Sequence, residues 1–231
     1  MSGRVVVLTG ATGGIGSAMV AMFAERGDDV FAMARPSPSL DELCAETSAA
    51  AAPVDLLRPS ELPAAVRDLG RIDALIHAAG VSEVATVEDS SADLWQQTMT
   101  INVTGPAELT RLLLPALRAA RGRVVFVNAV ADLHAVPKWS AYTASKAALT
   151  ELADSLRLEE AANGIRVTSI YPGGIATELL RKVRAGLGYP YDPALCVSPA
   201  TLATVLATVL DAPADVDITD IALKPPPPPA A

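Results

Sequence analysis

Thr9-Gly10-Ala11-Thr12-Gly13-Gly14-Ile15-Gly16 forms a glycine-rich turn between an apolar run at residues 4–9 and a helical pattern at residues 14–27. Glycine serves three purposes in such a turn: it permits a tight bend, it lets a pyrophosphate approach the backbone, and it allows close packing of the helix on the strand. The phosphates then meet unpaired N–H groups and the positive end of the helix dipole. The spacing is Gly-x-x-x-Gly-x-Gly, and its position after the first strand indicates a dinucleotide-binding turn.

Short apolar runs alternate with longer helical patterns along the whole chain. Each run is rich in Val and Ile, is bounded by Gly, Asp or Pro, and is too short for a core helix, which is typical of strands covered on both faces. We expect strands at residues 4–9, 29–34, 52–55, 72–78, 123–128, 165–171 and 217–223. Helices are expected at residues 14–27, 40–50, 59–70, 92–120, 140–164 and 198–211. This alternation predicts an α/β fold, a parallel sheet with helices on both faces.

Composition argues against several classes of protein. Of the 231 residues 51% are hydrophobic, so the chain is not disordered as a whole. The net charge of −8 argues against nucleic acid and anionic membranes as partners, because both attract a basic surface. Cys44 and Cys196 fit a reducing compartment as two buried apolar residues, and a single disulfide is the alternative.

The organisation along the chain is simple. No break in composition divides it, which predicts one domain at residues 1–224 and a proline-rich tail at residues 225–231. The tail is expected to be a frayed terminus, and a proline-recognising partner is the alternative. The sequence contains no run of eighteen apolar residues and no signal-peptide pattern. We therefore expect a cytoplasmic protein without a transmembrane helix.

Arg35 follows the second predicted strand, where no carboxylate occurs. In dinucleotide-binding folds an acidic residue near this point binds the adenosine ribose of NAD, whereas an arginine accommodates the 2′-phosphate of NADP. An arginine fork makes charge-assisted, bidentate bonds to phosphate. NADP is therefore favoured over NAD, and a solvated surface arginine is the alternative.

Tyr142 and Lys146 lie at the start of the predicted helix at residues 140–164, and their spacing of four places them on one helix face. A free tyrosine ionises near pH 10 and is a poor base at neutral pH, but a nearby ammonium lowers its pKa. Such a tyrosine can exchange a proton with an alcohol or carbonyl oxygen. Taken alone, the pair is more often an accident of amphipathic pattern. The glycine turn upstream favours the catalytic interpretation.

Over nearly its whole length the chain resembles the short-chain dehydrogenase/reductase family. The resemblance rests on motifs that occur in the family's order, namely Thr9-Gly10-x-x-x-Gly14-x-Gly16, Asp55-Leu56, Ala78-Ala79-Gly80, Asn102, Tyr142-x-x-x-Lys146 and Pro172-Gly173 with Thr177. It implies a single Rossmann-like, doubly wound domain with a seven-stranded parallel sheet. It also implies that two long helices, here residues 92–120 and 140–164, pair across a homodimer or homotetramer interface.

The resemblance assigns a role to each matching residue. Tyr142 would be the acid/base, Lys146 would bind the nicotinamide ribose and lower the tyrosine pKa, and Asn102 would hold a water in a proton relay. Asp55 and Leu56 would meet the adenine, and residues 176–191 would form a mobile lid over the substrate. The full set implied to contact the cofactor is Gly10, Thr12, Gly14, Ile15, Gly16, Arg35, Asp55, Leu56, Ala79, Gly80, Tyr142, Lys146, Pro172, Gly173, Ile175 and Thr177.

One departure from the family bears on activity. The family's catalytic serine lies thirteen residues before the tyrosine, and that position is Ala129. Alanine has no hydroxyl to bond the substrate oxygen, and loss of one such donor costs about 10²–10³ in turnover. Three explanations stay open: an introduced Ser→Ala change, a natural enzyme that uses Asn128 or a water instead, and a relative that has lost its chemistry.

Other side chains in the region are predicted to be structural. His77 replaces the asparagine that is usual in the family and is expected to support the strand end, and His134 is expected to be a solvated loop residue. Neither has cysteine or carboxylate partners at ligand spacing, so no metal is predicted. Trp95 and Trp139 are expected to pack, with Trp139 near the entrance of the site.

These observations predict an NADP(H)-dependent oxidoreductase that interconverts a carbonyl and a secondary alcohol of a small molecule, with activity reduced by Ala129. The cofactor would carry the hydride and the protein would supply orientation and electrostatics. The alternative is a catalytically silent NADP-binding redox sensor or scaffold. Tyr142, Lys146 and Asn102 together favour the enzyme, whereas Ala129 favours the silent binder.

Overall fold

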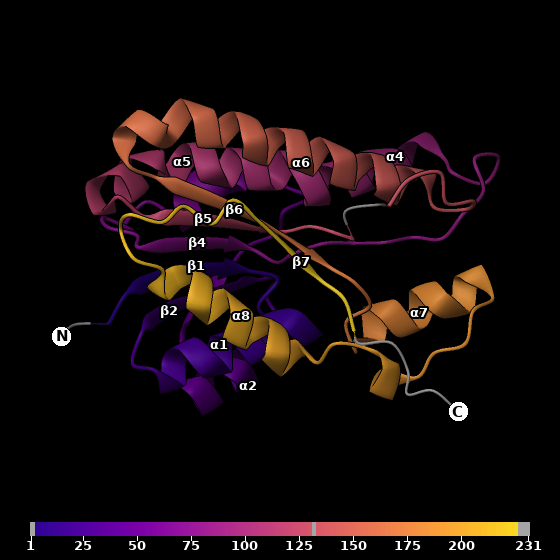
Figure 1. Ribbon diagram of the computed structural model, residues 1–231, viewed down its shortest axis with the longest axis horizontal. Helices are drawn as coiled ribbons and strands as arrows, with labels where there is room; N and C mark the ends of the chain where they lie inside the picture. The colour runs from indigo at the N-terminus through magenta and orange to yellow at the C-terminus, as the bar shows by residue number, and fades with distance from the viewer. Residues whose placement is uncertain (1–2, 131–132, 226–231) are drawn as a thin grey trace.

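The computed structural model describes residues 3–130 and 133–225, and its centre is a seven-stranded sheet in the order β3-β2-β1-β4-β5-β6-β7 (Figure 1). Every neighbouring pair is parallel, which confirms the predicted doubly wound fold. The strands are β1 (Val5–Thr9), β2 (Asp29–Ala34), β3 (Ala50–Pro53), β4 (Ala74–His77), β5 (Arg123–Val127), β6 (Arg166–Pro172) and β7 (Asp220–Leu223).

Helices cover both faces of the sheet (Figure 1). One layer holds α1 (Gly14–Glu25), α2 (Pro38–Thr47) and α8 (Pro199–Asp211), and the other holds α4 (Ala92–Met99), α5 (Gly105–Ala120) and α6 (Ser140–Glu160). The short α3 (Leu62–Ala65) packs against α5. A further helix, α7 (Glu178–Leu187), stands apart from both layers, beyond the ends of β6 and β7.

Each layer encloses its own core. In β1, Val6 and Leu8 belong to the core under α1 and α8, whereas Val7 belongs to the core under α5 and α6. Successive strand residues point to opposite faces, so a strand buried on both sides is apolar throughout. This is the reason that short, continuous apolar runs marked the strands correctly.

The structure corrects two element boundaries early in the chain. The strand predicted at residues 52–55 is β3 at Ala50–Pro53, because Ala50 pairs with Phe31 and Pro53 with Ala34. Alanine favours helices, but the alanine run pairs with β2 and belongs to the sheet, and α2 ends at Thr47.

Cys44 and Cys196 are both free and half-buried, so the expected full burial of the two cysteines was wrong.

The long helix predicted at residues 59–70 does not form. The chain instead makes a single 3₁₀ turn at Pro59–Glu61, followed by α3, which ends at Ala65. Proline fits only the first turn of a helix, since it has no N–H to donate and its ring clashes with the preceding turn. Pro59 and Pro63 therefore produce two short helical starts in place of one long helix.

The helix predicted at residues 92–120 is interrupted by a π-helical turn at Thr100–Thr104. Gly105 donates its N–H to the carbonyl of Thr100, five residues back. Pro106 has no N–H to offer Asn102, four residues before it, so the regular α-helical ladder fails at this point. Wider turns of this kind occur frequently at functional sites, and this one places Asn102.

The remaining differences are small. Helix α6 ends at Glu160 and continues as a 3₁₀ turn at Ala161–Asn163, and another 3₁₀ turn at Pro193–Leu195 precedes α8. Strand β7 begins at Asp220, three residues later than predicted. Within the described residues, no helix is long and apolar enough to cross a membrane. Of the proline-rich tail predicted at residues 225–231, all but the first residue lies outside the described residues.

Candidate active site

The glycine-rich turn has the shape that the sequence predicts. Gly10 has a φ of +72°, and a Cβ there would lie 2.7 Å from the backbone of Ala79. A Cβ at Gly16 would lie 2.1 Å from the carbonyl oxygen of Gly10. A side chain at either position would therefore displace the strand end or the first turn of α1. The turn brings β1, β4 and α1 into direct backbone contact.

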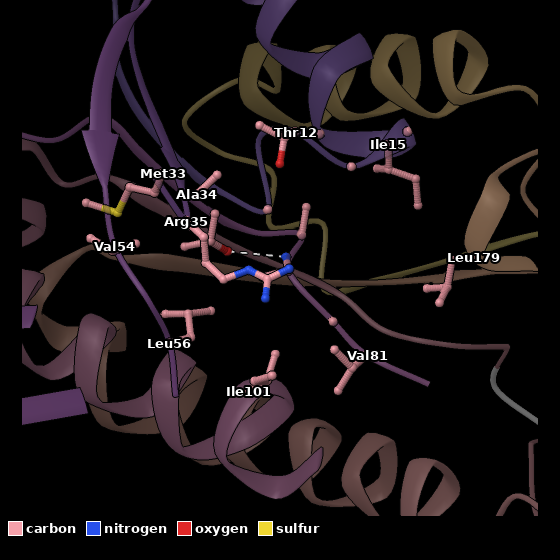
Figure 2. Close-up of a pocket in the computed structure, with 18 of the residues that line it drawn as sticks. Thr12, Ile15, Met33, Ala34, Arg35, Val54, Leu56, Val81, Ile101 and Leu179 are labelled. Atoms are coloured by element: carbon pink, nitrogen blue, oxygen red, sulfur yellow. Dashed lines mark hydrogen bonds between the residues drawn. The ribbon is translucent and has the colours of Figure 1, made fainter. Parts of the chain in front are cut away.

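A cleft of roughly 480 Å³ opens beside this turn (Figure 2). The N-terminus of α1 lies on its wall, and neither a capping side chain nor an acidic residue occupies the first turn of that helix. Eleven of the predicted cofactor residues line the cleft, namely Gly10, Thr12, Gly14, Ile15, Gly16, Arg35, Asp55, Leu56, Ala79, Gly80 and Thr177. The other predicted contacts, Tyr142, Lys146, Pro172, Gly173 and Ile175, lie outside its lining.

Several apolar residues that line the cleft were not predicted from the sequence. Five such residues are Met33, Val54, Val81, Ile101 and Leu179. Val54, Val81 and Ile101 each adjoin a residue that was predicted, so a search of the chain neighbours would have found them. They give the cleft walls suited to the flat face of an adenine or nicotinamide ring.

Arg35 extends from the end of β2 into the middle of the cleft (Figure 2). Its side chain is exposed, and it makes no ion pair with any acidic group in the part of the chain that the structure describes. Asp55 also lines the cleft and accepts a hydrogen bond from the N–H of Leu57 at 3.0 Å, which fixes the turn after β3. The guanidinium is therefore open to an anionic ligand.

Across the cleft, Thr177 is the residue directly before α7. Its hydroxyl caps that helix by accepting a hydrogen bond from the N–H of Leu180 at 3.2 Å. A Cβ at Gly14 would lie 3.1 Å from the Thr177 methyl, so this threonine faces the glycine turn directly. Gly173 donates to the carbonyl of Leu223, which ties the segment before α7 to β7. The predicted lid at residues 176–191 is built mainly of α7.

Asn102 is buried and joins three parts of the site. Its amide donates to the carbonyl of Val81 at 3.0 Å and to Ser145 Oγ at 2.9 Å, and its Oδ1 accepts the N–H of Val81 at 2.9 Å. A Cβ at Gly80 would lie 3.5 Å from Asn102 Oδ1 and 3.9 Å from Lys146 Nζ. Gly80 is thus the point where the cleft meets the predicted catalytic residues.

Lys146 and Tyr142 lie on one face of α6, as their spacing predicts. Lys146 is buried, donates from Nζ to the carbonyl of Val127 at 3.0 Å, and lies 5.8 Å from the centre of the Tyr142 ring. Burial lowers the pKa of Lys146 to about 8 and raises the pKa of Tyr142 to about 12. The predicted lowering of the tyrosine pKa was therefore wrong for this structure, since desolvation of the phenol outweighs the lysine at this distance.

Ala129 is the second residue after the end of β5 and is buried. Its neighbour Asn128 donates both amide hydrogens, to the carbonyl of Lys146 at 3.2 Å and to Thr150 Oγ1 at 2.9 Å. Asn128 Oδ1 accepts the N–H of Ala129. Because both amide hydrogens are engaged, Asn128 has no donor left for a substrate oxygen. This removes Asn128 as the substitute donor, and a water is the alternative left within that explanation.

The two histidines differ sharply in environment. His77 is buried, stacks on Phe126 with ring centres 4.9 Å apart, and bonds through Nε2 to Thr110 Oγ1 at 2.8 Å. Burial lowers the pKa of His77 to about 3, so it is a neutral core residue. His134 is exposed. The described residues contain no group of three His, Cys, Asp or Glu side chains that could hold a metal ion.

Comparison with known proteins decides the family. A family model described as short chain dehydrogenase matches residues 4–188. The chain belongs to the short-chain dehydrogenase/reductase family. It is 30% identical over 244 aligned residues to the "Dehydrogenase/reductase SDR family protein 7-like" of Drosophila melanogaster, covering 97% of this chain and 75% of that protein.

Solved short-chain dehydrogenases have the same architecture. One from Streptomyces avermitilis is 29% identical, with a TM-score of 0.83 over 96% of this chain and 89% of that one. A metagenomic member solved in complex with NADP is 25% identical, with a TM-score of 0.83 over 97% of this chain and 98% of that one. This short-chain dehydrogenase/reductase is accordingly an oxidoreductase of the NAD(P)-dependent kind, and the family's substrates are small molecules.

The cleft of this short-chain dehydrogenase/reductase fits a dinucleotide. The glycine turn leaves the backbone bare where a Cβ would collide, and the uncapped N-terminus of α1 provides N–H groups and a positive dipole end for phosphate. The lysine and asparagine lie beside Gly80, which is one of the residues that line the cleft.

Proposed function

We propose that the protein is an NADP(H)-dependent oxidoreductase that interconverts a carbonyl and a secondary alcohol. The observation that carries the proposal is the junction at Gly80, where Asn102 and Lys146 meet a cleft that begins at the glycine turn. Tyr142 lies one helical turn before Lys146 on the same face of α6. A dinucleotide bound along the cleft would present its reactive ring to these side chains.

The nicotinamide, when bound, supplies hydride to the substrate carbon or accepts it. Tyr142 would donate its phenolic proton to the oxygen of the carbonyl that is being reduced, or remove it in the reverse direction. Lys146 would bind the nicotinamide ribose and favour the phenolate once the proton has left. Its buried ammonium already lies 5.8 Å from the Tyr142 ring centre, which is close enough to respond to that charge.

Asn102 would connect the site to solvent through a water molecule. Its side-chain amide hydrogens are engaged with Val81 and Ser145, so we assign the water contact to its main-chain carbonyl. Pro106 cannot donate to that carbonyl, because it has no N–H. The π-helical turn thus gives Asn102 two separate tasks, one for its side chain and one for its backbone.

Arg35 supports NADP(H) over NAD(H). Its guanidinium projects into the cleft and has no acidic partner among the described residues, which suits the 2′-phosphate of an adenosine ribose. The metagenomic relative solved with NADP is consistent with this preference. An NAD-specific site would instead present a carboxylate to the ribose hydroxyls at this point.

Because position 129 has no hydroxyl and Asn128 has no free donor, we expect the turnover rate to be lower than that of a site with serine at this position. A catalytically silent NADP-binding sensor or scaffold is the second candidate, and the same observation favours it. Lys146 is buried beside Tyr142 and donates a hydrogen bond to the carbonyl of Val127 at 3.0 Å. This arrangement favours the oxidoreductase over the silent binder. A binder without chemistry has no need of a buried ammonium beside a phenol.

We also propose that residues 1–224 form one domain and that the protein is a homodimer or homotetramer. The outer face of α6 carries Leu158, which is 81% exposed in the single chain. Pairing of α5 and α6 between copies would cover that leucine. Sedimentation of the full chain, with Leu158→Glu as the disrupting variant, tests this arrangement.

The test of function combines binding with turnover. Calorimetry with NADPH and NADH measures cofactor choice, and oxidation of NADPH against a panel of carbonyl compounds measures activity. Ala129→Ser restores the hydroxyl, and a groove of roughly 220 Å³ lined by Asn128, Ala129 and Lys146 leaves room for it. We expect turnover to rise about 10²–10³-fold, the cost usually found for one missing donor. Binding of NADPH with no turnover by either protein would favour the silent binder.

A further inference from the structure

Trp139 stacks on the predicted acid/base. It is the residue directly before α6, and its ring lies parallel to that of Tyr142, with centroids 4.6 Å apart and an interplanar angle of 17°. Offset aromatic stacking adds to the stability gained from buried area alone and prefers a defined ring orientation. The indole therefore restricts where the phenol ring can lie.

The indole is itself held firmly. Trp139 Nε1 donates to Ser82 Oγ at 2.6 Å, and Ser82 is buried in the segment after β4. The carbonyl of Lys138 accepts the N–H of Ala85 at 2.8 Å, which ties the same two segments together a second time. Lys138 has a φ of +63°, an unfavourable conformation for a lysine that persists only where the surroundings fix it. These contacts set the position of Trp139 independently of Tyr142.

Tyr142 is half-buried, and within the described residues the hydrogen bond that reaches it goes to its main-chain carbonyl, from Ser145 Oγ at 2.7 Å. The ring is oriented by what touches its faces, namely the Trp139 indole and the Lys146 ammonium, which lies 5.8 Å from its centre. Ser82 adjoins Val81, and Val81 is held by Asn102. One continuous set of contacts therefore runs from the π-helical turn to the face of the phenol.

We propose that Trp139, anchored by Ser82, is a positioning residue that holds the Tyr142 ring in the orientation required for proton transfer. The inference rests on the proposed function, in which Tyr142 exchanges the proton. Trp139 touches the acid/base and acts through it. Ser82 acts one step further away, through its hydrogen bond to the indole.

The test is a set of variants assayed with NADPH and a carbonyl compound that the protein reduces, in both the parent and the Ala129→Ser background. Trp139→Ala removes the stack, and we expect kcat to fall about 10- to 100-fold, the usual cost of a misplaced reacting group, with the Kd for NADPH unchanged. The same change opens the phenol to water, so the alkaline limb of the pH profile of kcat moves to lower pH. Trp95→Phe is the matched control and keeps parental kinetics.

The anchor is tested by a double-mutant cycle. Trp139→Phe removes the donor and keeps a ring for stacking, whereas Ser82→Ala removes the acceptor. Each should lower kcat by about 3- to 10-fold, and the double variant should be no worse than the worse single, because both changes delete the same bond. These two variants decide the question even if Trp139→Ala fails to fold.

A readout without turnover is available, because the chain has two tryptophans and four tyrosines. In the Trp95→Phe protein, Trp139 is the sole indole, and ionisation of a stacked phenol quenches its fluorescence. We expect the alkaline quenching step to disappear in Trp95→Phe/Tyr142→Phe. Persistence of the step at its full amplitude would show that it does not arise from Tyr142 and would overturn the inference.

The kinetic outcomes distinguish failure of the Trp139 positioning role from failure of the proposed oxidoreductase function. Parental kcat and pH profile in Trp139→Ala, or additive losses in the double-mutant cycle, overturn the positioning role while Tyr142→Phe still abolishes turnover. If Tyr142→Phe retains turnover, or if neither the parent nor Ala129→Ser reduces any carbonyl, the proposed function fails and the positioning role fails with it.

Discussion

Replacing His77 by asparagine should make the folded protein less sensitive to acid. His77 is a neutral imidazole stacked on Phe126 and bonded to Thr110, and its pKa is lowered to about 3 by burial. In the unfolded chain a histidine titrates near pH 6.5. Below that pH the unfolded chain binds a proton that the folded protein does not, so the free energy of unfolding falls as the pH falls. The loss grows until the pH reaches the folded-state pKa.

The size of the effect follows from the two pKa values. Each pH unit below about 6.5 costs about 1.4 kcal/mol, so at pH 4.5 the parent should lose about 2.7 kcal/mol through this residue alone. Asparagine does not titrate, so His77→Asn should lack this loss, whatever its stability at neutral pH. His134→Asn is the matched control, because His134 is exposed and is the second of the two histidines.

The assay is urea unfolding followed by circular dichroism at pH 7.5 and pH 4.5 for the parent and both variants. Carboxylates also titrate in this range, but their contribution is common to the three proteins and cancels in the differences. If the parent and His77→Asn lose the same free energy between the two pH values, His77 takes up a proton in the folded state. The reasoning from its burial would then be wrong.

Three further changes test the cleft and its surroundings. Arg35→Ala should raise the Kd for NADPH by about 10- to 100-fold, because hydrogen bonds to a charged group contribute roughly 1.5–3 kcal/mol. If calorimetry shows that the affinity for NADH falls by the same factor, Arg35 does not bind the 2′-phosphate. Gly16→Ala should destabilise the fold by about 3 kcal/mol, since its Cβ would lie 2.1 Å from the carbonyl oxygen of Gly10. The control in thermal unfolding is Gly70→Ala, because a Cβ at Gly70 would have no neighbouring atom within 4 Å. Asn102→Ala deletes three side-chain hydrogen bonds and should lower both kcat, by about 10-fold or more, and the melting temperature. Parental kinetics would show that these side-chain bonds do not position the site.

Much of the fold was predictable because a parallel sheet buries both faces of its strands. β1, β4 and β5 each hold three or four consecutive apolar residues, so no partner needed to be known to identify them. The glycine turn was equally predictable, since its demands are local and steric. β3 was less so, because its alanines suit a helix and join the sheet only through pairing with β2.

The details of the site depend on contacts between distant parts of the chain. Trp139 and Ser82 are 57 positions apart in sequence, and nothing local marks them as partners. The pKa of Tyr142 was predicted to fall because the lysine spacing was visible in the sequence, whereas the burial that raises it was not. The π-helical turn did leave a trace, Gly105-Pro106 within an otherwise continuous helical pattern, and that trace was not used.

The paired bonds between Asn102 and Val81 make one side chain behave as a piece of backbone. Its amide accepts from the N–H of Val81 and donates to the carbonyl of Val81, as the backbone of a neighbouring strand would. The segment after β4 is therefore hydrogen-bonded beyond the end of the strand. Only an amide can both donate and accept in this manner. Conversion of Asn102 to aspartate by deamidation, a change of one functional group, would replace a donor by a second acceptor facing the Val81 carbonyl. Slow chemical ageing at this single residue would therefore loosen the loop that borders the active site while the sheet beneath it stays intact.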